Sequence, residues 1–96
     1  MTPLSDAILE LGEPRCMLAD FPHALRVIAE VMQRGRATHT GQDWRNLPAS
    51  FHLERARRHL DLLSQGDTTE PHLAHAATRL LMSLELLQGK TAARDE

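Results

Sequence analysis

Residues 69–89 read TEPHLAHAATRLLMSLELLQG, and this stretch decides the fold class. Thr69 is a good helix N-cap, and Pro71 suits a first helical turn. Apolar side chains then recur at the spacing of one helix face, at Leu73, Ala76, Ala77, Leu80, Leu84 and Leu87. We therefore predict a helix that begins at Thr69 and ends at Gly89.

The same segment also carries apolar groups away from this face. Leu81, Met82 and Leu86 leave the helix apolar on more than one side. In a thin domain this pattern predicts a partner, and a homodimer is the simplest one. The alternative is a wide core face in a bundle of three or four helices, with Met82 or Leu86 merely exposed.

Two further helices are expected in the first third of the chain. Residues 4–11 predict a short helix between Pro3 and Gly12. A second helix is capped at Asp20 and ends at Gly35. Its apolar face consists of Phe21, Leu25, Ile28 and Met32. Residues 36–47 lack this pattern and predict a loop that contains Trp44.

Another helix precedes the segment that opens this section. Residues 48–64 show the helical period, and Gly66 ends the helix. The expected core face consists of Leu53, Ala56, Leu60 and Leu63. Residues 90–96 are polar and predict a flexible tail.

Composition supports this all-helical interpretation. The 96 residues include 16 Leu and 12 Ala, whereas aromatic residues make up only 3%. These are helix-forming residues, and the lone Cys16 excludes a disulfide scaffold. The sequence therefore predicts one all-α domain over residues 1–96, a compact bundle of about four helices without a sheet.

Charge and hydropathy exclude several classes of partner. The formal net charge of -2 argues against direct nucleic-acid binding, because no overall basic field is available to neutralise phosphates. No segment has the pattern of a signal peptide or of a membrane span. Together with the unpaired Cys16, these features predict a cytoplasmic protein.

Histidines and acids gather around one predicted helix connection. The short connection over residues 65–68 makes its flanking helices antiparallel neighbours. It should bring together His59, Asp67, Glu70, His72 and His75. These residue types suit a divalent metal, and the start of the last helix suits phosphate. Histidines that only pack between helices are the alternative.

The order of several short motifs resembles a known family. The motifs are GEPR at residues 12–15, FPHALRVIAEV at 21–31, DWR at 43–45, RHL at 58–60, GD at 66–67 and HLAHA at 72–76. They resemble the phage and prophage family of dATP/dGTP diphosphohydrolase N-terminal domains over residues 11–88. The resemblance implies a shortened, divergent member with an all-α, MazG-like fold. Proteins of that type use carboxylate-held Mg²⁺ to cleave nucleoside triphosphates to monophosphate and pyrophosphate.

The acidic residues that such a magnesium site needs are depleted in this chain. No Glu-x-x-Glu or Glu-x-x-Asp pair lies within a predicted helix, because Glu10 and Glu13 straddle Gly12. Magnesium prefers several oxygen ligands. The sequence therefore assigns no catalytic residue and leaves open whether the chain is an enzyme.

Two hypotheses follow from the resemblance. In the first, the histidine and acid residues named above hold Mg²⁺ or Mn²⁺ beside a purine deoxynucleotide. Arg45 and Arg58 then neutralise its phosphates, and Trp44 stacks on its base. In the second, the same scaffold is a non-enzymatic binding protein, such as a phage-encoded inhibitor that docks on a host defence complex.

Overall fold

The computed structural model describes residues 17–38 and 43–95, with side chains described as far as residue 89. Its elements are the helix α3 (Pro22–Thr38), the 3-10 turn η1 (Trp44–Asn46), and the helices α4 (Ala49–Ser64) and α5 (His72–Asp95). No strand occurs among these residues, so the predicted all-α class is confirmed. The predicted helix over residues 4–11 lies outside the described residues.

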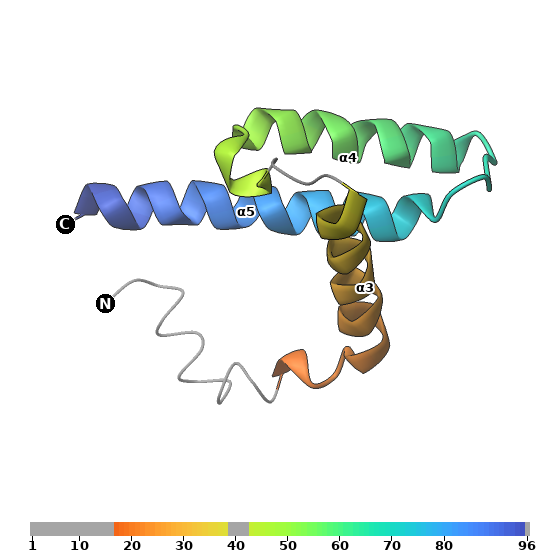
Figure 1. Ribbon diagram of the computed structural model, residues 1–96, viewed down its shortest axis with the longest axis horizontal. Coiled ribbons are helices and arrows are strands. Elements are labelled where there is room, and N and C mark those ends of the chain that lie inside the picture. The colour runs from red at the N-terminus through yellow and green to blue at the C-terminus, as the bar shows by residue number, and fades with distance from the viewer. Residues whose placement is uncertain (1–16, 39–42, 96) are drawn as a thin grey trace.

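The helices α4 and α5 form an antiparallel hairpin, and α3 runs across α5 at a steep angle (Figure 1). The long helix α5 is the centre of the arrangement, because it contacts α4, α3 and η1. η1 lies at the beginning of α4, and the α4–α5 connection lies at the opposite end of the hairpin. One group of polar side chains lies at the η1 end of the hairpin, and a second group lies at the end with the connection.

Of the three glycines predicted to end helices, only Gly66 follows the end of its helix. Gly66 has a φ of 84° and follows α4, as predicted. Gly35 and Gly89 lie inside α3 and α5, so the predicted ends at these residues are wrong. Consequently residues 36–38 of the predicted loop and residues 90–95 of the predicted tail are helical. A helical Gly costs only about 1 kcal/mol relative to Ala, and helix-forming residues follow both glycines.

The beginning of α5 also differs from the prediction. The helix begins at His72, not at Thr69. Glu70 precedes a proline, and the proline ring disfavours helical backbone at the residue before it. The Thr69 hydroxyl instead donates a hydrogen bond to Asp67 Oδ2 over 2.8 Å. The connection between α4 and α5 is therefore longer than predicted by residues 69–71, which include Glu70.

The interface of the hairpin consists of small and polar side chains. The buried residues are Ala49, His52, Ala56, His72, Ala76, Thr78 and Ser83. Ser83 Oγ joins the two helices by donating to the Ala49 carbonyl oxygen over 3.3 Å. Small residues allow α4 and α5 to approach closely. The buried hydroxyls of Thr78 and Ser83 each donate a hydrogen bond to a backbone carbonyl oxygen of α5, so both have partners.

The predicted core face of α4 is confirmed at Ala56 and is wrong at its three leucines. Leu53, Leu60 and Leu63 are each more than 40% exposed, whereas Ala56 is buried. The face that meets α5 is instead the one that carries His52 and Ala56. The predicted face of α3 is also partly exposed, because Phe21 and Leu25 are open to solvent.

Large apolar side chains remain on the outside of α5 as well. Leu73, Leu80, Leu81 and Leu84 are between 44% and 63% exposed. Met82 and Leu86 are half-buried. None of the helices in the described part of the chain is long and apolar enough to cross a membrane.

Candidate functional site

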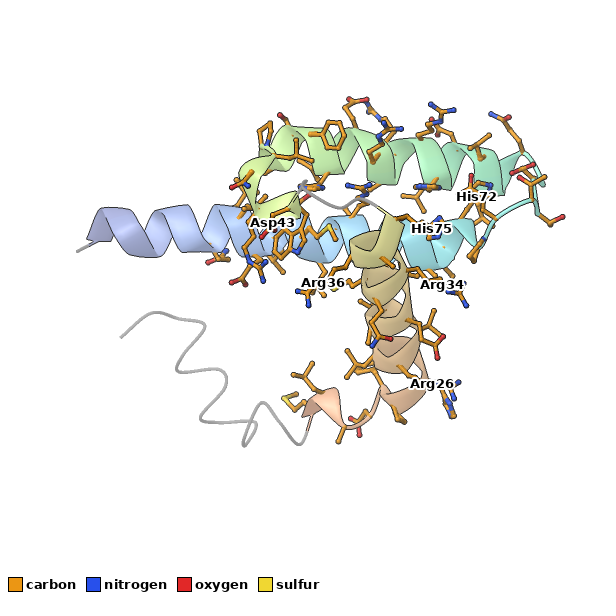
Figure 2. The ribbon with its side chains drawn as sticks, in the orientation of Figure 1. Arg26, Arg34, Arg36, Asp43, His72 and His75 are labelled. Atoms are coloured by element: carbon orange, nitrogen blue, oxygen red, sulfur yellow. The ribbon has the colours of Figure 1, made fainter. Side chains whose placement is uncertain are left out.

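Three histidines converge where α4 meets the beginning of α5. His59 Nδ1 lies 3.0 Å from His72 Nδ1, and the rings of His59 and His75 are 4.9 Å apart between their centroids. His72 and His75 lie at the connection end of the hairpin (Figure 2). The structure thus brings together the three histidines that the sequence places there.

Hydrogen bonds arrange His59 and His72 in a chain that begins at Asp67. His72 Nε2 is in very short contact with Asp67 Oδ2, and the His72 side chain has no solvent exposure. The hydrogen bond from His72 holds the pKa of the Asp67 carboxyl below its usual value. Since an ionised carboxylate only accepts, His72 Nε2 must carry the proton. In neutral His72 the Nδ1 atom then accepts from His59 Nδ1–H.

The second pair in the cluster joins His75 to Glu70. His75 Nδ1 lies 3.0 Å from Glu70 Oε1, and the Glu70 side chain is about half exposed, at 48%. Burial, followed by the charge of a protonated His75, lowers the pKa of His59 below its usual value. A lowered pKa favours the neutral imidazole, which is the form that offers a lone pair to a ligand.

This donor set does not match a carboxylate-held Mg²⁺ site. Oδ2 of Asp67 already accepts hydrogen bonds from His72 and from Thr69. Glu70 is then the only acidic side chain among the three residues whose ligand atoms could meet at one ion, the others being His59 and His75. Mg²⁺ requires oxygen ligands in octahedral geometry. The magnesium chemistry implied by the resemblance therefore finds no carboxylate cage in the described residues.

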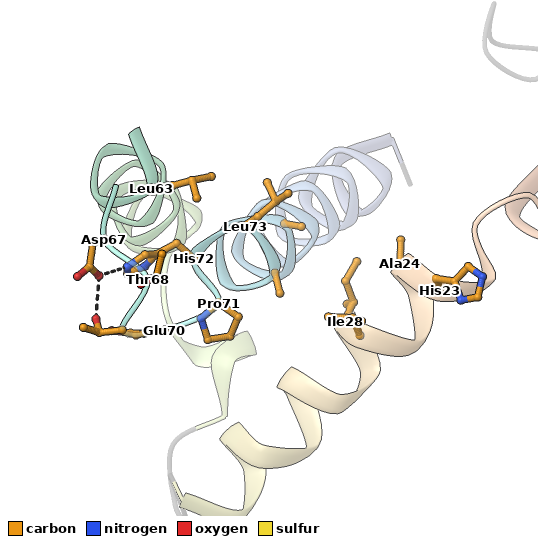
Figure 3. Close-up of a pocket in the computed structure, with 14 residues that line it drawn as sticks. His23, Ala24, Ile28, Leu63, Asp67, Thr68, Glu70, Pro71, His72 and Leu73 are labelled. Carbon is orange, nitrogen blue, oxygen red and sulfur yellow. Dashed lines mark hydrogen bonds and ion pairs between the residues drawn. The ribbon is translucent and has the colours of Figure 1, made fainter. Parts of the chain in front are cut away.

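A groove of about 780 Å³ opens beside this cluster, between α3 and the beginning of α5. Figure 3 shows Ile28 of α3 facing Pro71, with Asp67, Thr68 and His72 at the end of the groove next to the connection. Ile28, Leu63 and Leu73 supply an apolar wall. No lysine or arginine is among the described residues that line it. Anionic ligands in this groove must therefore find positive charge elsewhere.

Two of the residues predicted to bind the nucleotide lie at the end of the hairpin opposite the histidine cluster. Trp44 and Arg45 form η1, where the Arg45 guanidinium stacks 4.7 Å from the Trp44 ring and pairs with Asp43. The Trp44 ring meets His52, which precedes His59 by seven residues, or about 10 Å along α4. The third predicted residue, Arg58, directly precedes His59 on α4, and its side chain is exposed. The described contacts do not bring Trp44 and Arg45 to the histidine cluster.

A second buried polar network ties η1 to the hairpin. His52 Nε2–H donates to the Trp44 carbonyl oxygen over 2.9 Å, and His52 Nδ1 accepts from Arg79 Nη1 over 2.9 Å. Burial lowers the pKa of Arg79 from its usual value. In the sequence, His52 shares a helix face with His59, seven residues later, but this spacing does not indicate the network. Arg79 carries no local signal, because its role depends on a residue 27 positions away.

These features define a class: an all-helical domain with a histidine and carboxylate cluster at one end of a groove of ligand size. The family model described as dATP/dGTP diphosphohydrolase, N-terminal, matches residues 7–96, and the chain belongs to this family. Neither the curated proteins nor the solved structures give a match.

Proposed function

We propose that this chain binds a purine deoxynucleoside triphosphate, in the manner that its family name implies, and that the groove beside the histidine cluster is the binding site. One observation carries the proposal: a groove of about 780 Å³ opens next to the three histidines. Ligand sites usually occupy about 300–1,000 Å³. The groove therefore has room for a nucleotide.

The groove offers the two kinds of contact that a nucleotide requires. Its apolar wall, with Ile28 and Leu63, suits the face of a purine base. Leu73 and Ala74, which also line the groove, belong to the first turn of α5, where backbone N–H groups have no helical partner. Such N–H groups bind phosphate, and the helix dipole favours its negative charge.

The proposal is tested by adding dGTP or dATP with MgCl₂ or MnCl₂ to the purified chain and following thermal unfolding. We expect both purine nucleotides to stabilise the fold, by about 2.7 kcal/mol at a hundred times the dissociation constant. Leu63→Glu should abolish this shift by placing a negative charge in the groove. Pyrophosphate release, measured in the same mixtures, reports whether binding leads to hydrolysis.

The matched control is Leu60→Glu. Leu60 and Leu63 lie on the same helix and are both 42% exposed, but only Leu63 lines the groove. Leu60→Glu should therefore keep the nucleotide shift. The absence of a shift for wild-type protein with either purine nucleotide rejects the proposal, and equal loss in both variants rejects the groove as the site.

A second function, as a binding protein that acts as a homodimer, is favoured by a stripe of exposed leucines on α5, part of which also lines the groove. Leu73, Leu80 and Leu84 are exposed, and together with Ala77 they follow the alternating spacing of four and three residues found in coiled-coil seams. Only Arg79 and Glu85 are charged between residues 72 and 88, with histidines neutral. A stripe of this kind is complementary to itself, so a second copy of the chain is the proposed occupant.

Light scattering at tens of micromolar should then report twice the 10.8 kDa mass of one chain. Leu80→Lys combined with Leu84→Lys should give monomers, because four lysines would meet in the dimer. Leu53→Lys, at an exposed leucine of α4, is the control and should leave the mass unchanged. A wild-type protein of 10.8 kDa under these conditions contradicts the dimer.

A further inference from the structure

We propose that His59, Glu70 and His75 form a binding site for a zinc-type transition-metal ion, and that Asp67 and His72 hold His59 in the tautomer that the ion requires. The site lies beside the proposed nucleotide groove, so the inference rests on the proposed function for its biological use. The evidence that these side chains can bind a metal ion comes from their geometry alone.

The three ligand residues come from separate parts of the fold and meet at one point. One side-chain atom from each of His59, Glu70 and His75 lies within 4.8 Å of the other two. The pair His75 Nδ1 and Glu70 Oε1 is already at 3.0 Å. Two ligands of a tetrahedral zinc ion, each about 2 Å from it, lie about 3.3 Å apart. The three ligand atoms are therefore grouped closely enough to face one ion.

The hydrogen-bond chain from Asp67 determines which nitrogen of His59 is available. Asp67 fixes the proton on His72 Nε2, and when His72 is uncharged its Nδ1 atom can only accept, so His59 Nδ1–H donates. The remaining nitrogen of His59, Nε2, consequently keeps its lone pair. A metal-bound histidine commonly donates its other N–H to a carboxylate or another acceptor, which orients the ring and fixes its tautomer. Here the acceptor for His59 is His72, whose own proton position is fixed by the hydrogen bond to Asp67.

The identity of the ligand atoms determines the class of ion. Two imidazole nitrogens and one carboxylate oxygen suit zinc and related transition metals, and they do not suit Mg²⁺. Three protein ligands are also the usual number at zinc sites that keep a fourth position open. An open position next to the groove would accept an oxygen atom from water or from a phosphate. The cluster thus provides the positive charge that the lining of the groove lacks.

The test uses the metal alone, without nucleotide. The full chain is freed of metal by chelation and titrated with ZnCl₂ by calorimetry, with MgCl₂ as the parallel titrant. We expect one Zn²⁺ per chain and no binding of Mg²⁺ over the same range. CoCl₂ should produce the visible absorption of tetrahedral Co²⁺, and ZnCl₂ should abolish it. Failure of nucleotide binding leaves these results unaffected, so the two proposals fail separately.

Substitutions test which side chains bind Zn²⁺ and which only orient a ligand. His75→Ala should abolish Zn²⁺ binding, whereas His23→Ala, at an exposed histidine of the groove, should leave it intact. Asp67→Asn should weaken Zn²⁺ binding by about 10- to 100-fold, as expected for a group that orients a metal ligand. Asp61→Asn, at an exposed acid of α4, is its control. Zn²⁺ binding that survives His75→Ala, or tighter binding of Mg²⁺ than of Zn²⁺, overturns the proposal.

Nuclear magnetic resonance of the imidazole nitrogens tests the tautomer in the wild-type chain, so no variant needs to fold. We expect His59 to carry its proton on Nδ1 in the metal-free protein and to show the resonance shift of a ligated Nε2 after Zn²⁺ is added. A metal-free His59 with its proton on Nε2 rejects the relay from Asp67 through His72.

Discussion

Replacing Ala56 by leucine is expected to lower the free energy of unfolding by about 1–3 kcal/mol. Ala56 is 1% exposed and lies on the face of α4 that meets α5. Because the interface consists of small side chains, a leucine there must push the two helices apart. Urea unfolding followed by circular dichroism measures the effect, and each kcal/mol corresponds to about 4–8 °C in melting temperature for a domain of this size.

Two matched variants make this result specific to the interface. Ala29→Leu makes the same change at an exposed position of α3 and should alter stability by no more than about 0.5 kcal/mol. Leu60→Ala removes a 42% exposed leucine and should cost less than the 2–5 kcal/mol typical of a core leucine. A larger loss for Leu60→Ala than for Ala56→Leu would restore the leucine face as the core.

The sequence could predict the helical class because it depends on composition and on strong local signals. Leu and Ala dominate the apolar residues, and Pro48 and Gly66 flank α4 closely. What local signals could not settle is whether a glycine ends a helix. At Gly66 the backbone has positive φ, and polar residues and Pro71 follow. Arg36 and Ala37 follow Gly35, and these residues continue the helix.

The leucine core failed as a prediction for a different reason. Periodicity identifies a repeating apolar face, but it does not say which of two neighbouring faces meets the partner helix. On α4 the predicted face and the face that carries His52 share Ala56, and the structure buries His52 and Ala56 rather than the leucines. Close approach of two helices favours small residues, and polar residues can join them when each polar atom has a partner. The leucines of α4 (Leu53, Leu60 and Leu63) therefore remain exposed to solvent.

The convergence of the histidine cluster was predictable because it needs only one short connection. Helices joined by a few residues must be antiparallel, and this fixes His59 beside His72 and His75. The groove was not predictable, because it depends on how α3 crosses α5. Nothing in the sequence of α3 indicates that angle, and its residues are nowhere buried.

The second large effect is expected for His52→Ala, at the end of the hairpin opposite the histidine cluster. His52 is fully buried, and its two ring nitrogens join the Trp44 carbonyl to Arg79. Alanine leaves both groups without this partner, at a cost of about 1–3 kcal/mol for a buried group. The contact of the His52 ring with Trp44 is lost as well. Since Trp44 is the chain's single tryptophan, its fluorescence reports locally on η1.

We expect the emission of Trp44 in the His52→Ala variant to shift to the red below the main unfolding transition, while the helical signal persists. His23→Ala, at an exposed histidine of α3, should change neither signal. A double-mutant cycle with Arg79→Met then isolates the pair, because two residues in one hydrogen-bond network should couple by about 0.5–3 kcal/mol. Additive losses in that cycle would show that His52 acts by filling space. Coupled losses would show that its two hydrogen bonds hold η1 on the hairpin.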